Sequence, residues 1–165
     1  ASAALRQQAI DALARAHCMP MDDVVALTYD ATLKKEGITE NAAVRIGPSA
    51  FAGSSGWLAL VVFHELLHCP QFKFYTRHGL NLTAADAIAQ NRNTLRLLYA
   101  LDELACWLIS ELSLDVLALH PAEAAWFASS LTHWKAQLDD EPIAPFVRRG
   151  EFVRARLALM ARLVH

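Results

Sequence analysis

Hydrophobic and polar positions follow a helical spacing over most of the chain and predict about five helices. Their approximate ranges are 2–17, 56–69, 83–112 and 120–138, with a last helix after Pro145 that ends near residue 164. The second helix is expected to end before Pro70, because proline disfavours helical geometry in the residue that precedes it. Two short segments, 24–29 and 43–46, are rich in β-branched residues and predict strands, with a polar excursion between them. The pattern therefore indicates an α+β fold that is predominantly α-helical, with a small sheet of two to three strands.

Composition and charge narrow the class of protein. Ala and Leu supply 30 and 25 of the 165 residues, and only 19% of the residues are charged, which excludes a disordered chain, a collagen and a disulfide scaffold. A chain of this length predicts a single domain over residues 1–165. The net charge is −2 with both signs interspersed, so we do not expect nucleic acid as a partner. The arginines of the last predicted helix are interpreted as a solvated basic face.

Hydrophobic run length and cysteine usage bear on the location of the protein. The longest fully apolar run, Trp57–Phe63, has seven residues, whereas a helix that crosses a bilayer needs about 20. The first residues do not form a signal-peptide pattern. The three cysteines, Cys18, Cys69 and Cys106, have no CxxC spacing and are interpreted as thiols of a protein that folds in a reducing compartment. We therefore expect neither a membrane span nor a disulfide framework.

One five-residue pattern indicates the chemistry. His64, Glu65 and His68 form the sequence HExxH within the predicted helix 56–69, so two imidazoles four residues apart share one helical face. Two imidazole nitrogens in that arrangement suit a tetrahedral Zn2+, and Glu65 is then placed to accept a proton from a metal-activated water. A buried His/Glu/His cluster without a metal would need other partners. The pattern therefore predicts His64 and His68 as zinc ligands and Glu65 as general base.

A catalytic zinc site needs a third protein ligand, which the pattern leaves open. Two acids, Asp102 and Glu103, lie in an apolar stretch of the predicted helix 83–112, where a buried carboxylate requires a compensating charge. Helical geometry places Asp102 on the more apolar face and Glu103 on the same face as Arg96, with which an ordinary ion pair is the alternative. His78, which lies between the two helices, is a further candidate.

The motif and the acidic helix together resemble zinc metallopeptidases of the gluzincin type. The resemblance rests on His64–His68 (HELLH), a connector, and a helix that carries Leu101–Trp107 (LDELACW). It implies a zincin-like fold with Glu103 as the third ligand, in preference to Asp102. It also implies a small residue about one turn after that ligand, and Cys106 fits this requirement.

One position of the sequence differs from thermolysin-like enzymes, and one segment fits the zincin pattern. Trp107 stands where those enzymes have an aspartate four residues after the ligand glutamate, so Asp86 or Asp102 would have to supply a carboxylate behind the ligands. The segment 43–46 fits the edge strand that zincins place beside the active-site helix. The Ala-rich chain also resembles metallopeptidase domains of bacterial effectors and toxins, which implies export by a dedicated secretion system.

These features predict a zinc metallopeptidase that hydrolyses bonds of a peptide or protein substrate. Tyr99, one turn before Glu103, is the first candidate for a donor to the developing oxyanion. Behind it come His78, Tyr75 and Arg96. The alternative is a non-catalytic helical binding or interaction module with a structural or vestigial zinc site, which a fourth ligand such as His78 or Cys69 would favour. The sequence leaves the oligomeric state open.

Overall fold

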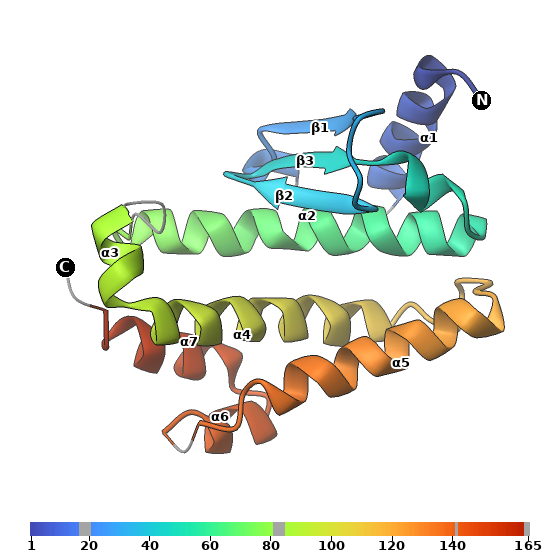
Figure 1. The fold of residues 1–165 in the computed structure, drawn as a ribbon. Coiled ribbons are helices and arrows are strands. Elements are labelled where there is room, and N and C mark those ends of the chain that lie inside the picture. The colour runs from blue at the N-terminus through green and yellow to red at the C-terminus, as the bar shows by residue number, and fades with distance from the viewer. Residues whose placement is uncertain (17–20, 81–84, 141, 164–165) are drawn as a thin grey trace.

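The computed structural model describes residues 1–16, 21–80, 85–140 and 142–163, and Figure 1 shows how their elements are arranged. Within these residues the chain forms seven α-helices, two 3-10 helices and one sheet of three strands. The α-helices are α1 (Ala3–Ala16), α2 (Ser55–Arg77), α3 (Ala85–Gln90), α4 (Arg92–Glu111), α5 (Pro121–Ala136), α6 (Ala144–Arg148) and α7 (Phe152–Met160). The strands are β1 (Ala26–Tyr29), β2 (Gly37–Glu40) and β3 (Ala43–Ile46), and the 3-10 helices are η1 (Met21–Asp23) and η2 (Pro48–Phe51). The predicted α+β class with a predominance of helix is confirmed.

The sheet has the order β1, β3, β2, with β1 parallel and β2 antiparallel to the central β3. Both predicted strands are present, and the polar excursion between them contains the third, β2. The hairpin from β2 to β3 turns through Asn41 and Ala42, whose φ angles of 50° and 61° are those of a tight hairpin turn. The expectation that the segment 43–46 forms the edge strand is wrong, because β2 pairs with its outer side and lies between it and the open edge.

Helix α2 has 23 residues and continues through Pro70, which corrects the predicted helix end at residue 69. It begins where the Ser54 hydroxyl accepts a hydrogen bond from Trp57 N at 3.0 Å. Pro70 has no N–H to donate, which costs about 3 kcal/mol in a helix interior. The turns beyond it carry Tyr75, which is buried and donates its hydroxyl to Asp102 on α4 at 2.6 Å. Such tertiary contacts offset the local cost, so the helix continues.

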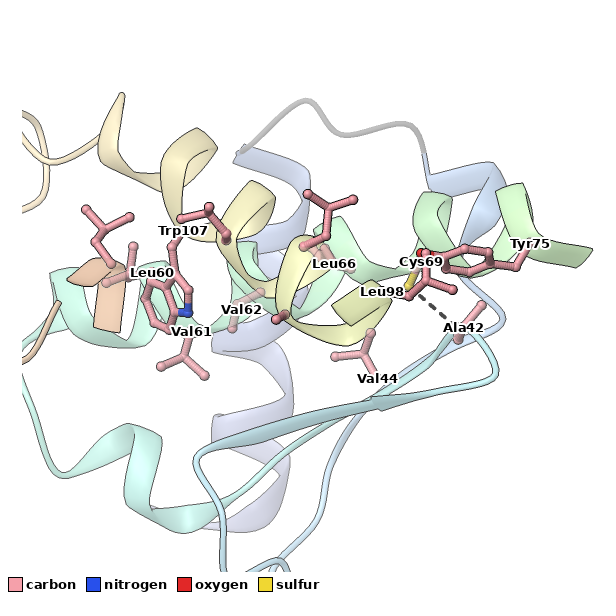
Figure 2. Packing of buried hydrophobic residues seen from close by; sticks show 14 of the residues in the cluster. Ala42, Val44, Leu60, Val61, Val62, Leu66, Cys69, Tyr75, Leu98 and Trp107 are labelled. Atoms are coloured by element: carbon pink, nitrogen blue, oxygen red, sulfur yellow. Dashed lines mark hydrogen bonds between the residues drawn. The ribbon is translucent and has the colours of Figure 1, made fainter. Parts of the chain in front are cut away.

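Helix α2 lies between the sheet and α4, and side chains from these three layers form the centre of the core (Figure 1). On its other sides α4 contacts α5 and α7, while α1 contacts α2 and β1. Figure 2 shows Val44 of β3, Val62 and Leu66 of α2, and Leu98 of α4 within one cluster of buried residues. The HExxH motif is therefore held inside the fold, between a sheet and a second long helix.

Two of the predicted helices are each divided in the structure. The range predicted to start at residue 83 contains α3 and α4, separated at Asn91, while residues 83 and 84 lie outside the described part of the chain. The last predicted helix contains α6 and α7, because Gly150, with a φ of +72°, turns the chain between them. The helix count of about five is thus corrected to seven for the described residues.

The Glu123 carboxylate ties the first turn of α5 to the start of α2. It accepts hydrogen bonds from the Ser54 N–H at 2.8 Å, the Ser54 hydroxyl at 2.6 Å and the His120 N–H at 2.7 Å. Desolvation opposes the charge of Glu123, but these hydrogen bonds outweigh it and hold its pKa below the usual range. The ionised carboxylate is therefore the form that the fold favours.

No helix among the residues described here has both the length and the hydropathy needed to cross a membrane. Cys69 and Cys106 are buried and have free thiols. Cys18 lies outside the described residues.

Candidate metal centre

Both histidines of the HExxH motif meet one acid of α4 between the two long helices. His64 and His68 lie one turn apart on α2, and their Nε2 atoms are 3.2 Å apart. Glu103 reaches both rings, since its Oε2 lies 3.2 Å from His64 Nε2 and its Oε1 lies 3.4 Å from His68 Nε2. One ligand atom from each residue lies within 4.8 Å of the other two, so this group could hold a metal ion.

The three side chains lie close enough together to share one metal ion. With metal–ligand distances of about 2.0–2.1 Å, the ligand atoms of a tetrahedral zinc site lie about 3.3 Å apart. The two histidine Nε2 atoms, 3.2 Å apart, are close to that value, and each lies 3.2 or 3.4 Å from a different oxygen of Glu103. Two imidazoles and a carboxylate form a donor set that zinc shares with neighbouring first-row metals. The residues present therefore fit a divalent metal ion.

Burial and charge both shape this centre. The side chains of His64, His68 and Glu103 are 6%, 16% and 12% exposed. Burial opposes the charge on Glu103, but hydrogen bonds from the two histidines outweigh it and hold the pKa of that carboxyl far below its usual range. Burial also opposes a charge on His68, but its contacts with Cys106 and Glu103 raise its pKa above the usual value. The centre therefore favours a positive charge beside the ionised Glu103, which a proton or a metal cation can supply.

Asp102, the alternative third ligand, has a different partner. Its Oδ1 lies 2.6 Å from Nη2 of Arg156 on α7, and its Oδ2 accepts the Tyr75 hydroxyl at 2.6 Å. The prediction of a solvated arginine face is wrong for Arg156, which is only 7% exposed because its guanidinium compensates this buried acid. Asp102 is therefore committed to an ion pair inside the fold, and Glu103 is the acid that faces the histidines.

Glu65, the predicted general base, contacts β2. Thr39 Oγ1 lies 2.7 Å from Glu65 Oε2 and 2.8 Å from the Glu65 main-chain oxygen, both within hydrogen-bond distance. A Cβ atom at Gly37 would lie 2.6 Å from Glu65 Cγ, so this position has no room for a side chain unless Glu65 moves. Neither Thr39 nor Gly37 was predicted from the sequence as part of the site. Gly37 and Thr39 are two residues apart, so they share one face if the segment forms a strand, and this spacing is the only indication in the sequence.

A cleft of about 930 Å³ opens beside β2. Its walls come from residues 34–41, from α2 and α4, and from Trp126 of α5. The three candidate metal ligands and Glu65 all line it. Its volume lies at the upper end of the range of ligand pockets, about 300–1,000 Å³, so a segment of several residues could enter.

Tyr99, the first predicted oxyanion donor, also lines the cleft, one turn before Glu103 on α4. Partial burial of its hydroxyl, together with the charge of Glu103 and a hydrogen bond to it, raises the pKa of Tyr99. Its ring packs edge-on against Trp134 of α5, with 5.4 Å between the centroids. The hydroxyl is thus protonated at neutral pH and positioned beside the centre.

The remaining candidates lie outside the group of three. His78 follows the end of α2, with its ring 2.8 Å from a main-chain oxygen of that helix. The Cys69 thiol faces the main-chain oxygen in the turn between β2 and β3 at 3.7 Å (Figure 2). Arg96 donates a hydrogen bond at 3.3 Å to the side chain of Gln137, the residue after α5. Tyr75 donates its hydroxyl to Asp102, the acid of the buried ion pair. The side chain of Asp86 lies outside the described part of the chain.

A scan of the chain against protein-family models found no match. Searches of curated proteins and of solved structures likewise found none.

Proposed function

We propose that this protein is a zinc-dependent metallopeptidase of the gluzincin type. The observation that carries the proposal is the convergence of His64, His68 and Glu103 from two helices, with one ligand atom from each within 4.8 Å of the others, in an open cleft that Glu65 also lines. A buried acid and two imidazoles at that spacing favour a cation, and a carboxylate next to them favours proton transfer. A zinc ion bound there supplies a Lewis acid that polarises a carbonyl and lowers the pKa of a water toward about 7.

The residues of the chain supply the proton transfers. Glu65 accepts the proton of the attacking water and then delivers it to the leaving amine. Thr39 holds the Glu65 carboxylate in place during both steps through their 2.7 Å hydrogen bond. The Tyr99 hydroxyl donates to the oxygen of the scissile carbonyl, where negative charge develops.

The open edge of the sheet supports a peptide as the substrate. Among the described residues, strand β2 pairs with β3 alone, and its residues line the cleft. An unpaired strand edge can add an extended peptide through main-chain hydrogen bonds. Because β2 also contacts Glu65, a peptide that adds to this edge would pass the proposed zinc site.

A non-catalytic module with a structural metal is the competing interpretation. Structural zinc sites are closed by four protein ligands, whereas catalytic sites have three and an open position. In the described part of the chain, the group that could hold a metal has three members, and neither His78 nor Cys69 joins it. This count favours catalysis. A role as an exported effector or toxin stays a prediction.

The test combines metal analysis with one substitution. Purified wild-type protein and Glu65→Gln should both bind about one zinc per chain by elemental analysis, while only the wild type should cleave a library of unstructured peptides. Glu111→Gln, an exposed change at the end of α4, is the matched control and should keep full activity. Zinc binding without cleavage of any peptide by the wild type would favour the structural module. Absence of metal would refute the peptidase and the structural zinc site, and would favour the module with a vestigial site.

A further inference from the structure

His68 has a partner on its outer ring nitrogen, and this partner links the two ligand-bearing helices. Because α2 continues past Pro70, Gln71 lies one turn after His68, with its Oε1 2.7 Å from His68 Nδ1. The other end of the same amide, Nε2, donates to the main-chain oxygen of Asp102 at 3.0 Å. Asp102 directly precedes Glu103 on α4. The Gln71 side chain therefore bridges the segment that carries His68 and the segment that carries Glu103.

This bridge determines which nitrogen of a neutral His68 carries the proton. A main-chain oxygen can only accept, so the NH2 end of the Gln71 amide faces Asp102 and its oxygen faces His68. His68 must then donate from Nδ1, which leaves the lone pair on Nε2. Nε2 is the atom that lies 3.4 Å from Glu103. The hydrogen bond thus selects the tautomer that a metal at this centre requires.

His64 is oriented in another way. Its Nδ1 is buried and has no hydrogen-bond partner among the residues described, and its ring packs against Trp107 with 4.2 Å between the centroids. The Cys106 sulfur lies 3.6 Å from His68 Nδ1, but sulfur is a weak acceptor and the Gln71 oxygen is closer. Of the two histidines, His68 is therefore the one that hydrogen bonding orients, and Gln71 provides that bond.

We propose that Gln71 is a positioning residue of the metal centre, which holds His68 in its metal-binding tautomer and ties α2 to α4 at the ligands. This inference rests on the proposed metal centre. Outer partners of metal ligands typically change metal affinity by about 10- to 100-fold when they are removed. Gln71 is not a ligand and acts only through His68.

Two substitutions at one position test the proposal. Gln71→Leu removes both polar ends of the amide at similar size, whereas Gln71→Glu keeps an oxygen toward His68 and loses the N–H toward Asp102. Competition with a chromophoric chelator measures the zinc Kd, and proton NMR of the zinc-loaded, 15N-labelled protein detects the His68 Nδ1–H. We expect Gln71→Leu to bind zinc about 10- to 100-fold more weakly and its Nδ1–H to exchange rapidly with water. Gln71→Glu should keep a protected Nδ1–H and lie closer to the wild type in affinity.

A control variant and the contrary outcomes complete the test. Gln8→Leu, on an exposed part of α1, makes the same exchange away from the centre and should leave both readouts unchanged. A Gln71→Leu protein with the zinc Kd and the protected Nδ1–H of the wild type would overturn the inference alone. If that variant does not fold, an unprotected Nδ1–H in Gln71→Glu would overturn it. A wild-type protein that binds no zinc would refute the metal centre itself, and this inference with it.

Discussion

Asp102 and Glu103 are neighbours on α4 with opposite surroundings, so replacing each with alanine should separate stability from metal binding. Asp102 is buried against the Arg156 guanidinium and the Tyr75 hydroxyl, and it is not a member of the group that could hold a metal. Glu103 faces His64 and the cleft. We therefore expect Asp102→Ala to destabilise the fold while leaving zinc binding nearly intact, and Glu103→Ala to do the reverse.

The size of the first effect follows from the contacts of Asp102. Removal of the Asp102 carboxylate deprives Arg156, which is 7% exposed, and the buried Tyr75 hydroxyl of the acceptor that they share. Breaking one side of a buried ion pair costs about 3–5 kcal/mol. For a chain of about 150–250 residues each kcal/mol lowers the Tm by about 2–4 °C, so a fall of roughly 6–20 °C is expected. The combined change with Arg156→Ala should destabilise by less than the sum of the single changes, because it also removes the stranded charge.

The assay measures urea unfolding in the presence of a chelator, and zinc affinity separately. Asp139→Ala, an exposed acid, is the control and should change the free energy of unfolding by no more than about 0.5 kcal/mol. Zinc affinity should fall by more than about 100-fold in Glu103→Ala, beyond the effect of an outer partner. In Asp102→Ala it should change by less than about tenfold, because the main-chain oxygen that receives Gln71 remains. An Asp102→Ala protein that loses zinc but keeps its stability would refute the assignment of the two acids.

Four further predictions concern the surroundings of the centre. Thr39→Val should retain zinc and lower kcat by about 10- to 100-fold, since it removes a hydrogen bond worth about 1.5–3 kcal/mol to the Glu65 carboxylate. Thr39→Ser should restore activity, and full activity of the valine variant would show that Glu65 needs no such support. Gly37→Ala should also lower kcat at unchanged zinc content, because the Cβ of the alanine would displace Glu65. An unchanged kcat would mean that Glu65 can shift without loss of activity. Zinc should bind more tightly as pH rises through neutrality, because the pKa of His68 is raised and a proton must leave when the metal binds. Calorimetry in two buffers of different ionisation heat measures that proton release. A pH-independent zinc affinity would contradict this prediction. The pKa of Glu123 is lowered in the fold, so its ionisation stabilises the protein above the ordinary glutamate pKa, and this contribution is lost on acidification. The Tm difference between wild type and Glu123→Gln should therefore shrink from pH 7 toward pH 3. A constant Tm difference would contradict this prediction.

The two histidines could be predicted from the sequence because their relation is local. A spacing of four in a helix places two side chains on one face whatever the rest of the fold does. The choice between Asp102 and Glu103 is not local. It depends on Arg156, which lies 54 residues after Asp102 and enters the core from α7. Periodicity marks Arg156 only as one of several basic residues, so the sequence alone cannot show which acid is compensated inside the fold.

The helix end and the third strand show the same division between local and tertiary information. Pro70 lowers the local preference for helix, and only contacts with α4 reveal why the helix continues. Strand β2 has no strict alternation of apolar and polar residues, and it becomes a strand by pairing with β3 along its length.

These two elements also provide the groups that support the centre. The extension of α2 beyond Pro70 carries Gln71, which binds His68, and β2 carries Thr39, which binds Glu65. The two candidate histidine ligands and the proposed base come from a pattern that one helix specifies, whereas their orientation comes from segments whose structure depends on packing. Suppose that a chain kept HExxH but lost the helical turn after Pro70 or the pairing of β2. It would keep the histidines and the glutamate of α2 and would lose the hydrogen bonds that orient them. An HExxH match alone is therefore weaker support for catalysis than the match together with these contacts.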